Sequence, residues 1–171
     1  MIELVLGGAR SGKSTYAEQQ VIATGLERVY IATASAGDGE MSERIALHQS
    51  QRADKNWRTL EEPVLLADLL LAESTVDNCI LVDCLTLWLS NCLFHPDSTC
   101  WDEQKAALLK TLPLIKGPVV FVSNEVGQGI IPLGEINRRF VDESGWLHQA
   151  IAQQVEKVTF VTAGLPQRLK G

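Results

Sequence analysis

The stretch GGARSGKS, residues 7 to 14, decides the fold class of this chain. Gly7, Gly12, Lys13 and Ser14 match the pattern G-x-x-x-x-G-K-[ST] without a mismatch, between an apolar run and a helix-like segment. Glycines let the backbone curl so that successive N–H groups point at phosphate oxygens, and the positive end of the following helix adds to the attraction. The pattern predicts a loop that binds nucleotide phosphates. A Gly-rich turn without a ligand is the alternative, which the flanking strand and helix disfavour.

Each residue of this loop is a candidate nucleotide-binding residue: Gly7, Gly8, Ala9, Arg10, Ser11, Gly12, Lys13 and Ser14. Lys13 is also a candidate catalytic residue, because its ammonium can reach the β- and γ-phosphates, and the Ser14 hydroxyl is a candidate Mg²⁺ ligand. A second Mg²⁺ ligand is expected at the end of another buried strand, and Asp83 closes the apolar run CILVDC at residues 79–84. The alternative role for Asp83 is to cap the helix that follows at Cys84.

Apolar strand-like runs alternate with helix-like segments along the whole chain. The runs are continuously apolar, which is typical of strands buried on both faces of a parallel sheet. The pattern predicts a single-domain α/β fold of the P-loop NTPase type over residues 1–171, with a mostly parallel sheet and helices on both faces. Strands are expected at 2–6, 28–33, 78–83, 119–123 and 158–162, and helices at 13–23, 40–52, 64–72, 85–94, 101–112 and 133–155. Gly145 interrupts the last helical pattern and predicts a kink or a boundary there.

Composition excludes several other classes of protein. The net charge of −6 argues against a broad basic face for nucleic acid. Neither a signal-peptide pattern nor a run of 18 apolar residues occurs, so we expect no membrane span and a cytoplasmic location. The four cysteines form no CxxC pair and no zinc-binding spacing, so buried free thiols are expected.

A histidine between two arginines stands out in EMSERIALHQSQR, residues 40–52. Arg44, His48 and Arg52 are spaced four apart, so on a helix they would line one face. Nearby cations disfavour the imidazolium form, and a neutral imidazole is a competent nucleophile. Taken alone, a solvated surface histidine is the more common situation, and His95 and His148 carry even less information.

Five segments occur in a characteristic order: GGARSGKS, YIATA, EMSERIALHQSQR followed by NWRTLEEP, LVDCLTLWLSN, and VSNEVGQGIIP. This series resembles the bifunctional adenosylcobinamide kinase/adenosylcobinamide-phosphate guanylyltransferase family of cobalamin biosynthesis, over nearly the whole chain. The resemblance implies two reactions. A nucleoside triphosphate phosphorylates the aminopropanol hydroxyl of adenosylcobinamide, and GMP from GTP is then joined to that phosphate through a covalent histidine–GMP intermediate, with Mg²⁺ as cofactor. The histidine of R-I-x-x-H falls on His48.

The resemblance also implies further site residues and partners. GTP and ATP are the expected nucleotide substrates, and the resemblance allows either one as the donor in the kinase step. Beyond the loop, the implied nucleotide contacts are Thr33, Ala34, Ser35, Gln49, Ser50, Gln51, Arg52, Glu61 and Asp83. A carboxylate suits the N1–H and 2-amino edge of guanine, and the spacing does not separate Glu61 from Glu62 for this contact. The family is trimeric, which makes a homo-oligomer the expectation.

Two rival functions stay open at this point. A P-loop small-molecule kinase without guanylyl transfer would leave His48 as a surface residue, and a regulatory ATPase would have a partner protein as its output. The segment NEVGQGIIP follows an expected strand, so Asn124 and Glu125 would face the ligand crevice unless the segment is only a tight packing turn.

Overall fold

One seven-stranded sheet organises the chain, in the order β3-β2-β4-β5-β1-β6-β7, in a computed structural model that describes residues 1–34 and 56–171. Five neighbouring strand pairs are parallel, and β6 and β7 are antiparallel. The strands are Ile2–Gly7 (β1), Glu27–Ala32 (β2), Trp57–Glu61 (β3), Asn78–Asp83 (β4), Val119–Asn124 (β5), Lys157–Thr162 (β6) and Leu165–Lys170 (β7). The expectation of a mostly parallel sheet is confirmed.

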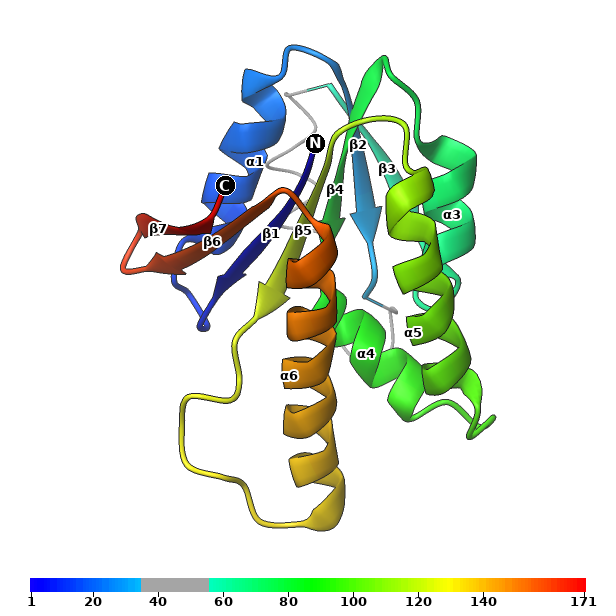
Figure 1. The fold of residues 1–171 in the computed structure, drawn as a ribbon, viewed down its shortest axis with the longest axis vertical. Helices are drawn as coiled ribbons and strands as arrows, with labels where there is room; N and C mark the ends of the chain where they lie inside the picture. Colours follow the sequence, from blue (N-terminus) through cyan, green and yellow to red (C-terminus); the bar gives the residue numbers. More distant parts are fainter. Residues whose placement is uncertain (35–55) are drawn as a thin grey trace.

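Helices cover both faces of this sheet, as the sequence predicted (Figure 1). The described helices are Lys13–Ala23 (α1), Leu66–Glu73 (α3), Leu85–Leu93 (α4), Cys100–Thr111 (α5) and Glu135–Gln154 (α6). Successive residues of β1 explain the arrangement, since Leu4 faces α5 and α6 while Val5 faces α1, and both are fully buried. A strand with apolar layers on both sides must be apolar throughout, which is what the sequence pattern indicated.

Two strands were missing from the sequence prediction. β3 is an edge strand whose Arg58, Thr59 and Glu61 are exposed, so it lacks the apolar run that marks the buried strands. β7 is exposed along its whole length and contains Pro166, which an edge strand tolerates. It joins β6 through Ala163 and Gly164, both with positive φ (52° and 78°), as a tight two-residue hairpin turn needs.

Other expectations have mixed outcomes. The predicted boundary at Gly145 is wrong, because α6 runs unbroken through it. All four cysteines are buried and free, as expected. Among the described helices, none has both the length and the apolar character needed to cross a membrane. The helix expected at 40–52 lies outside the described residues.

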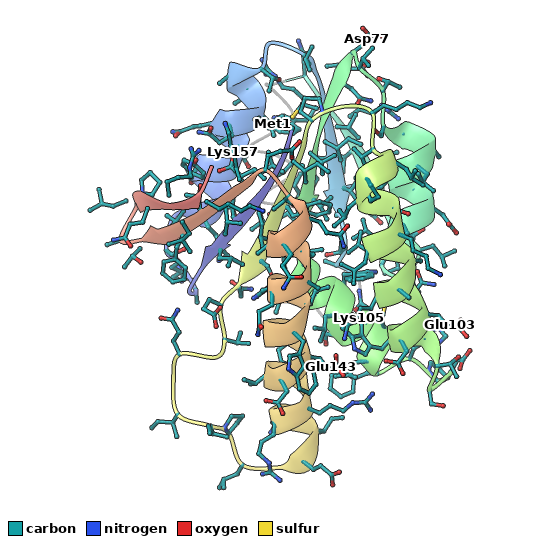
Figure 2. All side chains as sticks on the ribbon, in the orientation of Figure 1. Met1, Asp77, Glu103, Lys105, Glu143 and Lys157 are labelled. Carbon is teal, nitrogen blue, oxygen red and sulfur yellow. The ribbon has the colours of Figure 1, made fainter. Side chains whose placement is uncertain are left out.

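Two tryptophans connect the helices on the face of the sheet that α3, α4, α5 and α6 cover. Trp88 of α4 is fully buried, donates its indole N–H to the Val64 carbonyl at 2.8 Å, and meets the Trp101 ring edge-on at 5.5 Å. Lys105 of α5 then pairs with Glu143 of α6 at 3.0 Å (Figure 2). These contacts hold α4, α5 and α6 together beneath the edge of the sheet that carries the phosphate loop.

Replacing Trp88 by Phe should destabilise the fold, because the Val64 carbonyl loses its donor inside the core. A buried group left without its partner costs about 1–3 kcal/mol. Urea unfolding followed by far-UV circular dichroism measures the loss. Trp146→Phe is the matched control, since Trp146 is 55% exposed, and it should leave the midpoint nearly unchanged. Equal midpoints for the two variants would contradict the role given to Trp88.

Candidate functional site

The phosphate loop connects β1 to α1 with a backbone that two glycines make possible. A Cβ on Gly7 would lie 2.6 Å from the Val161 carbonyl oxygen, and one on Gly12 would lie 3.0 Å from the Gly164 Cα. Gly12 also has a φ of 92°, in the left-handed region that favours glycine. The amide of Gly164 donates to the Ser11 carbonyl at 2.8 Å, which ties the loop to the β6–β7 turn. The backbone of GGARSGKS is therefore held on both sides.

Lys13 is largely buried at the start of α1, and its ammonium donates to the Gly8 carbonyl at 3.0 Å. Burial lowers the pKa of Lys13 below its usual value, while the nearby Asp83 carboxylate works in the opposite direction. Lys13 and Asp83 therefore interact electrostatically across the carboxyl ends of β1 and β4. A phosphate oxygen is a stronger acceptor for this ammonium than a carbonyl.

Asp83 ends β4 and accepts a hydrogen bond from the Tyr30 hydroxyl at 3.2 Å. The residue at the N-cap of α4 is Cys84, which makes no side-chain capping bond. Burial, and then the charge of Asp83, raises the pKa of the Cys84 thiol to about 11, so the thiol stays protonated at neutral pH. Asp83 is thus the ionisable group that faces Lys13 here.

Thr33 and Ala34 follow β2 at the same edge of the sheet. Thr33 is fully buried, and its hydroxyl both donates to the Cys84 carbonyl (2.7 Å) and accepts from the Cys84 amide (2.8 Å). The Asn91 amide donates to the Thr33 carbonyl at 2.7 Å. The Thr33 side chain therefore fastens the end of β2 to the end of β4, beside Asp83.

Glu61 and Glu62, which the sequence did not separate, have different surroundings. Glu62 accepts hydrogen bonds from the amides of Val64 (2.8 Å) and Leu65 (2.7 Å) just before α3 begins. Glu61 is exposed at the end of β3, opposite Ala32 of β2. One Glu62 oxygen is thus occupied by the chain itself.

The structure brings together the loop residues, Thr33, Ala34, Asp83 and Glu61 at the carboxyl ends of β1, β2, β4 and β3. This edge is where parallel α/β sheets bind ligands. The remaining sequence candidates, Ser35, His48, Gln49, Ser50, Gln51 and Arg52, lie outside the described residues, together with Arg44.

His148, which carries little information in the sequence, lies in a buried polar network at this edge. His148 Nε2 lies 2.7 Å from Ser123 Oγ, and Ser123 Oγ lies 3.1 Å from Thr86 Oγ1. The Asn124 amide donates to Thr86 Oγ1 at 2.7 Å, and the other His148 nitrogen lies 3.7 Å from Glu125 Oε2. A histidine 25 residues away from its serine gives no signal in sequence spacing alone.

A glycine-rich loop between a buried strand and a helix, with a lysine facing an aspartate on another strand, defines a P-loop nucleotide-binding protein. Two solved structures share the fold, an ATPase domain and the RadB recombinase. The ATPase domain has a TM-score of 0.51 at 12% identity, over 93% of this chain and 68% of that one. The recombinase has a TM-score of 0.51 at 14% identity, over 93% and 73%.

The sequence matches the family described as cobinamide kinase/cobinamide phosphate guanyltransferase over residues 3–169, and the chain belongs to this family. A relative in Pseudomonas aeruginosa, the bifunctional adenosylcobalamin biosynthesis protein CobP, is 56% identical over 100% of this chain and 98% of its own length. The Escherichia coli relative, bifunctional adenosylcobalamin biosynthesis protein CobU, is 34% identical over 99% and 100%. The chain is a bifunctional kinase and guanylyltransferase of adenosylcobalamin biosynthesis, as the resemblance implied.

Lys13→Ala should reduce phosphoryl transfer by several orders of magnitude, because Lys13 is the cation by which the loop motif neutralises charge on the transferred group. The midpoint of thermal unfolding should change little, since this lysine contributes charge to the site rather than packing. Initial rates with cobinamide and labelled nucleotide measure the loss. Lys110→Ala, an exposed position at the end of α5, should behave like the unaltered enzyme. Kinase activity near the original rate in Lys13→Ala would remove Lys13 from the mechanism.

Proposed function

We propose that this chain uses its phosphate loop for two successive transfers onto one corrinoid. In the first, a nucleoside triphosphate gives its γ-phosphoryl group to the hydroxyl of adenosylcobinamide. In the second, GTP gives GMP to the new phosphate through a covalent adduct on His48. The observation that carries the proposal is the buried Lys13 facing Asp83 at the end of GGARSGKS, in a chain whose family has both activities.

Ser14 and Asp83 suit a Mg²⁺ ion that is shared with the substrate phosphates. Mg²⁺ is usually held by one or two protein oxygens, with phosphate oxygens and water completing the shell. The described residues contain no group of three or more acidic, histidine or cysteine side chains that could hold a metal by themselves, which fits such a shared site. A bound ion supplies positive charge at the β- and γ-phosphates. Lys13 adds its own charge there, and the loop N–H groups keep the phosphates aligned.

The guanylyl transfer is proposed to run through His48 in two displacements. A neutral His48 nitrogen forms a bond to the α-phosphorus of GTP, and the bond from that phosphorus to the β-bridging oxygen breaks, so pyrophosphate leaves. An oxygen of adenosylcobinamide phosphate then attacks the same phosphorus, His48 departs, and adenosylcobinamide-GDP forms. Arg44 and Arg52, four residues away from His48 on either side in the sequence, suit the charge that develops on these phosphates.

Guanine recognition is assigned to Glu61. Its carboxylate can accept from N1–H and the 2-amino group together, and adenine lacks that edge. The engagement of Glu62 with the start of α3 supports Glu61 over its neighbour. Thr33, Ala34, Ser35, Gln49, Ser50, Gln51 and Arg52 complete the proposed nucleotide contacts. Either ATP or GTP can be the phosphoryl donor in the kinase step of this proposal.

The same proposal includes a homo-oligomer of this chain, which the family resemblance implies is a trimer. Ile130 (98% exposed), Ile131 and Leu133 lie in the long segment between β5 and α6, and the first turns of α6 extend beyond the sheet (Figure 1). Exposed apolar side chains grouped in this way favour an interface with another copy. A cytoplasmic location remains the expectation that accompanies this function.

His48→Ala separates the two chemistries. The variant should lose covalent labelling by α-labelled GTP, and synthesis of adenosylcobinamide-GDP should fall by several orders of magnitude, because a covalent route needs its nucleophile. Phosphorylation of adenosylcobinamide should survive in part, since γ-phosphoryl transfer needs no histidine adduct. Denaturing gel analysis of labelled protein and product chromatography measure both.

His95→Ala, an exposed position in the 94–99 segment, is the control and should label normally. Retained labelling in His48→Ala would move the nucleophile elsewhere. Absence of labelling in the unaltered chain would mean that GMP passes to the acceptor phosphate without a histidine adduct.

Asp83→Asn should weaken magnesium-dependent turnover while the fold persists, because an amide keeps the shape of the carboxylate and removes its charge. The rate should require a magnesium concentration raised by about tenfold or more for half-saturation, in line with the loss of a charged ligand. Titration of MgCl₂ at fixed nucleotide concentration checks this. An unchanged magnesium dependence would remove Asp83 from the proposed metal site.

A further inference from the structure

The two transfers differ in one chemical requirement. The acceptor of the kinase step is a hydroxyl, which must lose its proton as the new oxygen–phosphorus bond forms. The guanylyl transfer uses a neutral imidazole and then a phosphate that is already ionised, so neither nucleophile has a proton to lose. A general base is therefore needed for the kinase step alone.

Glu125 occupies the place where such a base would stand. It is the first residue after β5, and its amide donates to the Gly7 carbonyl at 3.0 Å, directly beside the phosphate loop. Its side chain is 21% exposed. The neighbours of β1 are β5 and β6, and among the described residues Glu125 is the acidic residue at the carboxyl end of either strand.

Strand register separates Glu125 from the proposed metal ligand. Asp83 of β4 lies opposite Val122 of β5, three residues before Glu125, which corresponds to about 10 Å along the strand. Val122 lies opposite Val5 of β1, so Asp83 is level with the end of β1 before the loop, near Lys13. Glu125 lies further along the strand direction, beside Gly7 at the start of the loop.

A network behind Glu125 fixes its orientation. Glu125 Oε1 accepts from the Gly127 amide at 2.7 Å, and Oε2 faces His148 Nδ1 at 3.7 Å. One arrangement of protons satisfies this network: Thr86 Oγ1 accepts the Asn124 amide and donates to Ser123, and the Ser123 hydroxyl donates to His148 Nε2. In that arrangement the remaining imidazole proton lies on Nδ1, toward Glu125.

Burial lowers the pKa of His148 below its usual value, with Glu125 acting in the opposite direction, which agrees with a neutral ring. The buried Nδ1 has no hydrogen-bond partner within the described part of the chain, and the Glu125 carboxylate is the acceptor that faces it. Ser123 is only 1% exposed, so this network is no hydrolytic triad and its serine meets no substrate.

We propose that Glu125 is the catalytic base of the kinase step and that His148 is the residue that positions it. The acceptor oxygen forms a bond to the γ-phosphorus, and the bond from that phosphorus to the β-bridging oxygen breaks, its electron pair leaving with the nucleoside diphosphate. The hydroxyl proton passes to the Glu125 carboxylate and from there to solvent. The proposal rests on the kinase half of the proposed function and is independent of the His48 adduct.

Glu125→Gln tests the base directly. The kcat for phosphorylation of adenosylcobinamide should fall by about 10²–10⁴-fold, the usual contribution of a general base, with the KM for nucleotide within twofold. Labelling by α-labelled GTP should stay within twofold. Supplied adenosylcobinamide phosphate should still be converted to adenosylcobinamide-GDP, because it bypasses the impaired step. Glu103→Gln, on the outer side of α5, is the matched control and should retain the original kcat (Figure 2).

His148 is tested by two substitutions of similar size. Leu removes the hydrogen bond to Ser123 and the polar contact with Glu125, and Gln keeps an acceptor for Ser123 and a donor for Glu125. His148→Leu should lower the kinase kcat at least tenfold without altering labelling, and His148→Gln should recover most of it. Thermal unfolding by circular dichroism identifies any variant that fails to fold, and Glu125→Gln decides the base assignment in that case.

Kinase activity in Glu125→Gln within threefold of the original enzyme would overturn the assignment of the base. A parallel fall in kinase rate and labelling would also overturn it, since both reactions share only the nucleotide site. Equal kinase rates in His148→Leu and His148→Gln would overturn the positioning role. If the unaltered chain never labels with α-labelled GTP, the His48 proposal fails while the kinase measurements still decide this one.

Discussion

The close approach of the phosphate loop to the turn between β6 and β7 fixes the geometry on which the site depends. Neither Gly7 nor Gly12 has room for a side chain, because the Val161 carbonyl and the Gly164 backbone lie against them. The Gly164 amide also holds the Ser11 carbonyl. The loop is therefore fixed before any ligand binds, and α1 starts at a position that buries Lys13 near Asp83. Preorganised charge of this kind is worth more than charge that must be ordered on binding.

Polar residues inside the core reinforce that position. Glu3 of β1 is fully buried under α1, where it accepts hydrogen bonds from Tyr16 (3.1 Å) and from Thr159 of β6 (2.7 Å). Tyr16 follows the loop by two residues, so these bonds tie the first turn of α1 to the two strands beneath it. Thr33, just after β2, bonds to the Cys84 backbone, and Ser123 of β5 bonds to His148 and Thr86. Buried polar groups that have partners limit the geometries a core can adopt, which suits a site that must align phosphates.

The sequence could predict the parts of this molecule that a strong local pattern encodes. The loop, five of the strands and the described helices follow from apolar periodicity and from one glycine-rich motif. β3 and β7 did not follow, because edge strands such as Trp57–Glu61 and Leu165–Lys170 are exposed and carry no buried stripe. Gly145 was misleading, since packing of α6 against the sheet outweighs the modest preference of one glycine. His148 could not be found, because its partners come from β5 and α4 and meet only in the folded chain.

A parallel sheet explains how one sheet edge can serve two different transfers. All parallel strands end at the same edge, so residues from distant parts of the sequence meet there. The strand order then separates their tasks: β5 lies between β1 and β4, and the register sets Asp83 level with Val5, before the loop, and Glu125 beside Gly7, where the loop starts. If the two carboxylates were side by side, the proton acceptor would also bind the cation and would then be a weaker base. The stagger along β5 keeps the two carboxylates apart, so that one can remain close to Lys13 while the other stays available to a hydroxyl.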